Sequence, residues 1–288
     1  MEFLITFVNG LSLGGIYAMI ALGYTMVYGI AKMLNFAHGD IIMVGGYTIL
    51  VFLWINPIVA IIASVLFCIA LGVLIEKVAY KPLRGSSPLA VLITAIGISY
   101  LLQSIAQIAF GSAPKFVNIA DLGLLKIGEL AIGYSTIITL AASIVIMIVL
   151  NLFVKFSRVG RAMIAVSEDK GAAQLMGINV NTIIMITFAI GSGLAALASL
   201  FFLLQAPSIT PTFGALPGIK AFTAAVIGGI GSIPGAMVGG LLLGVIECFA
   251  QSVPEIAPYT DAIEFSILII ILLVKPTGLL GKKRREKV

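Results

Sequence analysis

Apolar runs long enough to cross a lipid bilayer recur from one end of this chain to the other, and they constrain its fold more than any other feature. About 20 apolar residues in a helix span a hydrocarbon core of roughly 30 Å. Among the 288 residues, 60% are hydrophobic and only 10% are charged. Because lipid cannot satisfy backbone hydrogen bonds, such runs are helical. We therefore predict an all-α polytopic membrane protein, with one transmembrane domain over residues 1–288.

The runs predict eight or nine membrane segments, including short or broken helices. Full spans are expected at 7–30, 57–75, 89–110, 134–154, 180–204, 235–253 and 259–274. Two further runs are shorter. The run 41–56 is barely long enough to span, and the run 219–231 is too short, because about 13 helical residues cover only about 20 Å. The first run lacks a basic leader and is too long for a signal sequence, so we expect it to be retained. Cys68 and Cys248 lie inside apolar runs and suggest neither a disulfide nor a metal site.

Basic residues set the expected orientation, because cytoplasmic loops carry an excess of Lys and Arg. Thirteen of the seventeen basic residues fall in three segments, 76–88, 155–181 and the tail 275–288. We expect these segments on the cytoplasmic side, with the N-terminus and the loop 111–133 outside. With this orientation, the basic tail lies inside only if the run 219–231 supplies one more crossing. That run is too short to cross alone, so the proline-rich segment 207–217 before it must enter the membrane as extended chain. Such backbone is tolerated only inside protein or beside a wet cavity.

The longest polar interruption, 155–181, predicts a docking helix. Ser167 can cap a helix from about Glu168 to Met176, and Gly177 followed by an apolar residue fits a Schellman ending. Exposed Ala172, Ala173 and Met176 would form a small apolar knob that fits a socket on a partner. The alternative is a solvated loop between two spans. The residues that we expect to contact a cytoplasmic partner are Arg158, Gly160, Arg161, Glu168, Asp169, Ala172, Ala173 and Gly177.

Glycine-rich breaks in the two halves of the chain are candidates for a transport path. One break lies at Asn35–Gly39 with Gly45–Gly46, and the other at Gly228–Gly235. Interrupted helices in both halves are typical of transport sites, where freed amides meet a carboxylate and freed carbonyls an ammonium group. Plain helix packing around glycine is the alternative. The candidate path residues are Asn35, His38, Gly45, Gly46, Lys220, Thr223, Gly228 and Gly229.

Ionisable residues at membrane depth are costly, on the order of 3 kcal/mol, and indicate function by default. His38 and Asp40 either line the path or, as we favour, cap helix ends at the cytoplasmic surface. Lys220 either attracts anionic groups or extends its amine to water. For Glu247 we expect an internal hydrogen bond rather than proton coupling.

Catalysis is not expected from this composition. One histidine and few acids leave no Ser-His-Asp or Cys-His set, and no GxxxxGK[ST] phosphate loop is present. We therefore predict a non-enzymatic chain that binds no ATP, metal or other cofactor itself, and no nucleic acid. The basic tail is expected to fix the orientation of the chain in the membrane and to contact anionic lipid.

Three stretches give the chain a resemblance, over nearly its full length, to the branched-chain amino acid ABC transporter permeases of bacteria and archaea. They are GIYAMIALGYTMVYGIAKMLNFAHGD at 15–40, SRVGRAMIAVSEDKGAAQLMGIN at 157–179 and KAFTAAVIGGIGSIPGAMVGG at 220–240. ABC importers carry an E-A-A-x-x-x-G pattern in the coupling loop. Here Gly171-Ala172-Ala173 precedes Gly177 and the acid is displaced to Glu168, which leaves the role of Glu168 open.

The resemblance implies a coupling loop at 155–181, a homologous partner permease, two cytoplasmic ATPase subunits that bind ATP and Mg²⁺, and an external substrate-binding protein. It also implies a place in the bacterial or archaeal inner membrane and aliphatic amino acids as cargo. Urea, short amides and other neutral amino acids remain open as cargo. An ATP-independent secondary transporter or channel, and a purely structural subunit, remain open as classes.

Overall fold

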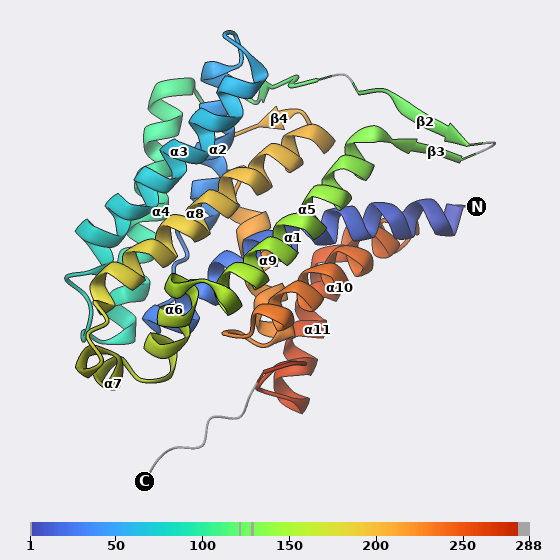
Figure 1. The fold of residues 1–288 in the computed structure, drawn as a ribbon. Coiled ribbons are helices and arrows are strands. Elements are labelled where there is room, and N and C mark those ends of the chain that lie inside the picture. Colours follow the sequence, from blue (N-terminus) through green and yellow to red (C-terminus); the bar gives the residue numbers. More distant parts are fainter. Residues whose placement is uncertain (1, 121, 128–129, 282–288) are drawn as a thin grey trace.

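The computed structural model describes residues 2–120, 122–127 and 130–281, and it confirms the predicted helical membrane fold (Figure 1). Seven described helices, two of them counted with a short adjoining helix, are long and apolar enough to cross a membrane. The long helices are α1 (Glu2–Ala31), α3 (Pro57–Ile75), α4 (Pro88–Phe110), α5 (Tyr134–Phe156), α8 (Val180–Gln205), α10 (Ile233–Ser252) and α11 (Thr260–Val274). Two shorter apolar helices are α2 (His38–Phe52) and α9 (Ala215–Gly228).

The remaining elements are small and lie between the spans. A π-helical turn η1 (Glu76–Tyr80) extends α3, and a 3₁₀ turn η2 (Ala257–Tyr259) precedes α11. The other helices are α6 (Arg158–Glu168) and α7 (Lys170–Leu175). The strands are β1 (Lys115–Phe116), β2 (Leu124–Ile127), β3 (Leu130–Gly133) and β4 (Ser208–Ile209). Strands β1 and β4 pair antiparallel, as do β2 and β3.

Side-chain caps explain where several spans begin. Asn56 accepts a hydrogen bond from the Ile58 amide at 2.8 Å, and Asn179 accepts one from the Thr182 amide at 3.2 Å. Ser232 accepts one from the Gly235 amide at 3.2 Å, with Pro234 in the first turn of α10. Such caps satisfy amides that the first turn of a helix leaves unpaired.

Helix α1 runs through the centre of the bundle and packs most closely on α10. The contact is made by small residues. A methyl group built on Gly10 would lie 2.8 Å from the Val245 Cα, and one on Gly14 would lie 2.8 Å from the Leu241 Cα. Backbones that approach this closely gain van der Waals contact that larger side chains would prevent.

The two short helices, α2 and α9, each follow an extended segment that turns back into the bundle. Residues 32–37 double back along α1, so that His38 at the start of α2 lies beside Gly23. Residues 206–214 run along α2, where Ile209 contacts Gly46 and Gly214 contacts Gly39. The proline-rich segment thus returns into the bundle, as its predicted dip into the membrane would require. The return of residues 32–37 was not foreseen.

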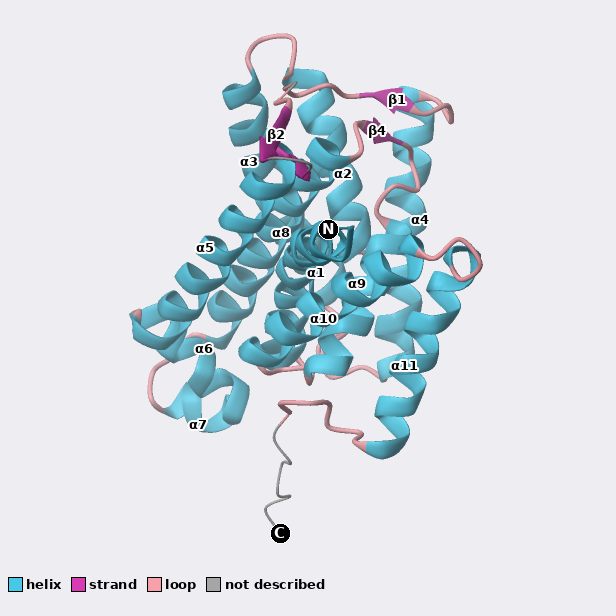
Figure 2. Ribbon diagram, turned by 90° about the vertical axis from the view of Figure 1, so that its right-hand side faces the viewer, coloured by secondary structure: helices cyan, strands magenta, loops and turns pink. Residues whose placement is uncertain are grey.

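The three basic segments gather at one end of the bundle, as predicted, within the part of the chain that is described. At this end lie α6 and α7, opposite the strands (Figures 1 and 2). Arg84 donates a hydrogen bond to Asn181, and Leu279 donates its amide to the Ile227 carbonyl at 2.8 Å. At the other end Val117 donates its amide to the Pro207 carbonyl at 3.0 Å.

Candidate functional site

Helix α6 begins where the chain turns sharply after α5. Ser157 accepts a hydrogen bond from the Gly160 amide at 2.8 Å. A methyl group on Gly160 would collide with the carbonyl oxygens of Phe153 and Val154, so this close reversal requires glycine. Arg161 donates to the Phe156 carbonyl at 3.1 Å, while the Arg158 side chain is exposed. Gly160 and Arg161 therefore fix the angle at which α6 leaves the bundle.

Helix α7 is the short helix that the polar stretch predicted, but it is capped by a different residue. Asp169 accepts a hydrogen bond from the Ala172 amide at 3.0 Å. The predicted cap at Ser167 is wrong: residues 167 and 168 still belong to α6, and the Ser167 hydroxyl donates to the Ile164 carbonyl at 2.7 Å. Asp169 has extended backbone angles, which separate the two helices.

The end of α7 has the predicted Schellman geometry. Gly177 has φ +80° and donates its amide to the Gln174 carbonyl at 2.9 Å. The Ile178 amide donates to the Ala173 carbonyl at 3.0 Å. This pair of hydrogen bonds defines the motif, and glycine is favoured at the left-handed position.

The apolar knob exists, but its residues differ from those predicted. Ala173 is only 3% exposed and faces the bundle, so its place in the knob was wrong. Leu175 and Met176 are 91% and 82% exposed, while Ala172 and Glu168 also face outward. We call Leu175 and Met176 the α7 tip.

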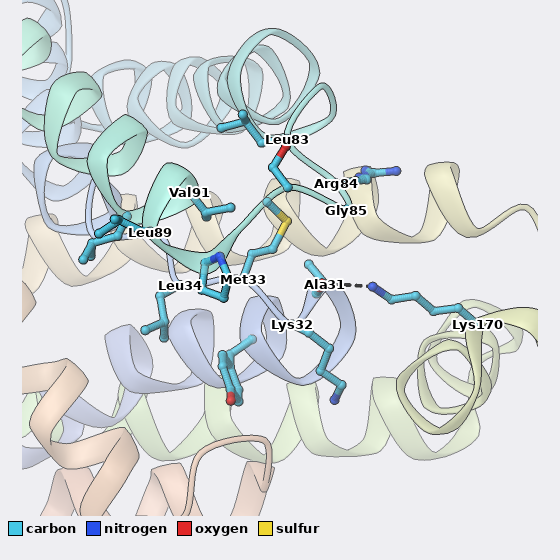
Figure 3. Close-up of a pocket in the computed structure, with 14 residues that line it drawn as sticks. Ala31, Lys32, Met33, Leu34, Leu83, Arg84, Gly85, Leu89, Val91 and Lys170 are labelled. Atoms are coloured by element: carbon cyan, nitrogen blue, oxygen red, sulfur yellow. Dashed lines mark hydrogen bonds between the residues drawn. The ribbon is translucent and has the colours of Figure 1, made fainter.

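Lys170 ties α7 to the end of α1. Its amine donates to the Ala31 carbonyl at 3.0 Å, as Figure 3 shows. Burial and, to a smaller degree, the nearby positive charge of Arg84 lower the pKa of Lys170 below its ordinary value. Arg84 itself is paired with the buried Glu76. These contacts connect α7 with the 76–88 segment and with the membrane helices.

Two cavities open at this end of the bundle. One, of about 640 Å³, lies between the end of α1, the start of α4 and Lys170 (Figure 3). The other, of about 1070 Å³, lies between α1, α5, α6 and the α9–α10 turn. Glu168, Asp169 and Ser232 line the larger cavity. None of the eight predicted path residues lines either of these two cavities.

The first predicted break is buried inside the bundle. Asn35 accepts a hydrogen bond from the Tyr80 hydroxyl at 2.8 Å. His38 packs edge-on against Tyr24 with ring centroids 4.7 Å apart. Asp40 accepts a hydrogen bond from Gln103 of α4 at 2.8 Å. The preference for surface capping by His38 and Asp40 was therefore wrong, because residue 37 precedes α2 without a side-chain cap and both side chains are buried.

Gly45 and Gly46 do not interrupt α2, which continues through them. They allow close packing instead: a methyl group on Gly45 would lie 3.2 Å from the Ala196 Cα, and one on Gly46 would lie 2.9 Å from the Ser199 hydroxyl. The alternative of helix packing around glycine therefore applies to this pair.

The second predicted break, Gly228–Gly235, is the turn between α9 and α10. Gly229 and Gly231 have φ +113° and +93°, values that glycine adopts without strain. Gly228 accepts a hydrogen bond from the Leu280 amide at 2.9 Å. Gly228 and Gly229 thus pack against residues 277–281, at the same end as α6. Thr223 is buried within α9.

Lys220 is buried in a cluster of acids rather than extended to water. Its amine lies 2.7 Å from Glu247, 2.8 Å from Asp261 and 3.3 Å from Glu264. The internal hydrogen bond expected for Glu247 is confirmed by this contact and by Gln251, which donates to it at 3.1 Å. Glu264 is also fully buried, and its position in an apolar run four residues after the start of α11 is the sequence signal for this. Within the described residues no group of acids, histidines and cysteines has metal-binding geometry.

Comparison with known proteins gives one consistent result. The family described as "Branched-chain amino acid transport system / permease component" matches residues 6–272. The high-affinity branched-chain amino acid transport system permease protein BraD of Pseudomonas aeruginosa is 46% identical, over 98% of this chain and 96% of the relative. The corresponding protein LivH of Escherichia coli strain K12 is 41% identical, over 100% of this chain and 98% of the relative.

A solved structure gives the same fold. PsaBC from Streptococcus pneumoniae in complex with Fab covers 96% of this chain and 93% of its own, with a TM-score of 0.53 and 16% identity.

Proposed function

Because the chain belongs to the family of branched-chain amino acid transport permeases, we propose that it is the membrane subunit of an ATP-driven importer for aliphatic amino acids. Permease components of ABC transporters are non-catalytic membrane subunits, so the chain is not an enzyme. In the assembly it would form the translocation path together with a second, homologous permease.

The observation that carries the coupling role is the α7 tip. Two large apolar side chains stand almost fully exposed at the end of a helix whose start and finish are fixed by hydrogen bonds. Exposed apolar groups on a rigid support are typical of a contact surface. The polar rim around them, Arg158, Arg161 and Glu168, would orient a partner. An ATPase subunit that receives this tip can move α6 and α7 as one body.

Transmission into the membrane follows from the contacts of α7 and α6. Lys170 joins α7 to the end of α1, and Gly160 joins α6 closely to α5. A displacement of the tip would therefore act on two spans. Alternating access then results when ATP-dependent closure of two motors tilts the two permeases relative to each other.

The remaining parts of the proposal concern orientation and partners. The end that carries α6 and α7 would face the cytoplasm, with the N-terminus outside and the tail 275–288 inside, in the inner membrane of a bacterial or archaeal cell. Two ATPase subunits would supply the sites for ATP and Mg²⁺. An external binding protein would deliver the amino acid, and would hold most of the selectivity.

Uptake in proteoliposomes tests the proposal. Vesicles would contain this chain, its neighbouring permease and the ATPases, with the binding protein outside and radiolabelled leucine as cargo. We expect uptake that requires ATP and every component. Assembly without leucine uptake would redirect the cargo to urea, short amides or other neutral amino acids. Uptake by this chain without the ATPases would replace the importer by a secondary transporter or channel.

Orientation is tested separately by a single cysteine at Ser232, in a background without Cys68 and Cys248. Ser232 lines the larger cavity at the α6–α7 end. We expect an impermeant thiol reagent to label it from the cytoplasmic side. Labelling only from outside would overturn the topology.

A further inference from the structure

One lysine faces three acids where α9, α10 and α11 meet, and their burial differs sharply. We call Lys220, Glu247, Asp261 and Glu264 the Lys220 cluster. The side chains of Lys220, Glu247 and Glu264 are 4%, 7% and 0% exposed, whereas that of Asp261 is 51% exposed. Water can therefore solvate the negative charge of Asp261, but it cannot reach the carboxyl groups of the two glutamates.

The buried charges do not balance if every group is ionised. One positive lysine then faces two negative glutamates inside a membrane span, which leaves one uncompensated charge. Burying such a charge is far more costly than burying a paired one. The neighbouring groups supply no second cation: Tyr17 of α1 and Cys248 of α10 face the glutamates, and Gln251 is a neutral amide.

The charge balances if one of the two glutamates carries a proton. Hydrogen bonding indicates which carboxyl groups can share that proton. Lys220 approaches Oε2 of Glu264 only to 3.3 Å, and neither this contact nor any other gives either oxygen of Glu264, or Oε2 of Glu247, a partner with hydrogen-bond geometry, although all three atoms are buried. The carboxyl groups of Glu264 and Glu247 lie next to each other. Ionised carboxylates only accept hydrogen bonds, so two of them can bond to each other only when one carries a proton.

We propose that the Lys220 cluster is a proton-binding site in which Glu264 is protonated and donates to Glu247. The buried trio is then neutral, with one lysine, one carboxylate and one carboxylic acid. The proton comes from water at the half-exposed Asp261 side, and no other group changes its charge.

The bound proton has a positional role, because α11 buries few side chains completely. Only Thr260 and Glu264 are buried, while Ile267, Leu268 and Ile271 pack against the core partly exposed. Glu264 therefore contributes a buried contact between α11 and α9. Removing the proton would place two negative carboxylates side by side and weaken this attachment.

Infrared spectroscopy of the purified protein tests the site directly. We expect a carbonyl stretch from a buried carboxylic acid at neutral pH in the wild type, and its loss in E264Q. D261N is the matched control, since Asp261 touches the same lysine from the same helix but is half exposed. It should keep the band. A wild-type spectrum without the band, or a band that persists in E264Q, would overturn the proposal.

Thermal unfolding against pH gives an independent readout. Between about pH 6 and about pH 10 the wild type should lose about 2–4 °C more than E264Q, because only the wild type has this proton to lose. D261N should follow the wild type. Equal losses in wild type and E264Q would contradict a bound proton. Stabilisation of the wild type by Na⁺, absent in E264Q, would show that a metal cation occupies the site instead.

Discussion

The junction between α2 and α9 and the tip of α7 use side chains in opposite ways. At the junction, Gly39, Gly214 and Gly218 bring two helix starts together with no room for a methyl group. At the α7 tip, Leu175 and Met176 project large side chains that touch almost nothing in this chain. The junction is thus complete within one polypeptide, whereas the tip is built for contact with something else. Substitutions should separate the two regions, since the junction governs folding and the tip governs transport.

The largest effect is expected at the junction. In G214L the new side chain would collide with the Gly39 backbone, which cannot yield without moving α2. Overpacking of this kind costs about 1–3 kcal/mol or more, and we expect most folded protein to be lost. Size-exclusion chromatography of a fluorescent fusion measures the folded fraction. G97L on α4, where nothing lies within 4 Å of the glycine, is the control and should fold normally. Normal folding of G214L would mean that the junction is loose.

At the tip, the double variant L175E/M176E should fold normally and lose transport. Contact residues of this kind are worth about 2 kcal/mol or more, so we expect uptake to fall by about 30-fold. Reconstituted leucine uptake and copurification of the ATPases measure the loss. G171A is the control, because Gly171 is exposed on the same helix with only Asp169 nearby at 3.4 Å. Wild-type uptake by the double variant would remove the coupling role.

A173E should fall between the two regions. If Ala173 were exposed, as the sequence suggests, a charge here would uncouple transport without affecting the fold. Since the side chain is buried, the charge should also destabilise α7, and a moderate loss of folded protein should accompany the loss of uptake. Yield and uptake measured on the same preparations distinguish these outcomes. Uptake that falls while the yield of folded protein stays full would mean that α7 tolerates a charge at position 173 and that Ala173 acts in coupling alone.

The smallest effect is expected for D169A, which removes the cap of α7. Loss of such a cap costs about 1 kcal/mol, enough to raise the open population of α7 by about fivefold. Hydrogen exchange at the amides of 172–176 should accelerate accordingly, with D169N close to wild type because asparagine also caps. If D169A left exchange unchanged, the helix would be held by other contacts.

The spans and the ends of α7 could be predicted because each depends on local sequence. Apolar length defines α3, α8 and α10, and Gly177 with Ile178 defines the Schellman ending. The predicted return of the proline-rich segment also rested on local signals, Pro207 to Pro217. The return of residues 32–37 has no such signal, because Asn35 and His38 fit a surface turn equally well.

The candidate site was harder to predict than the fold. Ala173 and Leu175 lie on nearly opposite sides of α7 and both are apolar, so their residue types do not show which of them faces outward. Ser167 and Asp169 are both good caps. The partners of Lys220 come from two other helices, so no spacing along the chain could identify them. Gly45 and Gly46 illustrate the reverse error, since glycine pairs serve helix packing as readily as helix breaks.

The junction also has a consequence for how the protein is made. The contact between Gly39 and Gly214 cannot form until Gly214 has been synthesised. Gly214 leaves the ribosome about 175 residues after Gly39, or about 9–35 s later at ordinary synthesis rates. During that interval α2 is too short to remain in the bilayer by itself. Ser64 and Cys68 of α3 hydrogen-bond to the carbonyls of Gly45 and Ile41 at 2.9 and 3.6 Å. Helix α3 therefore supplies contacts that α2 can make before the second half of the chain is synthesised.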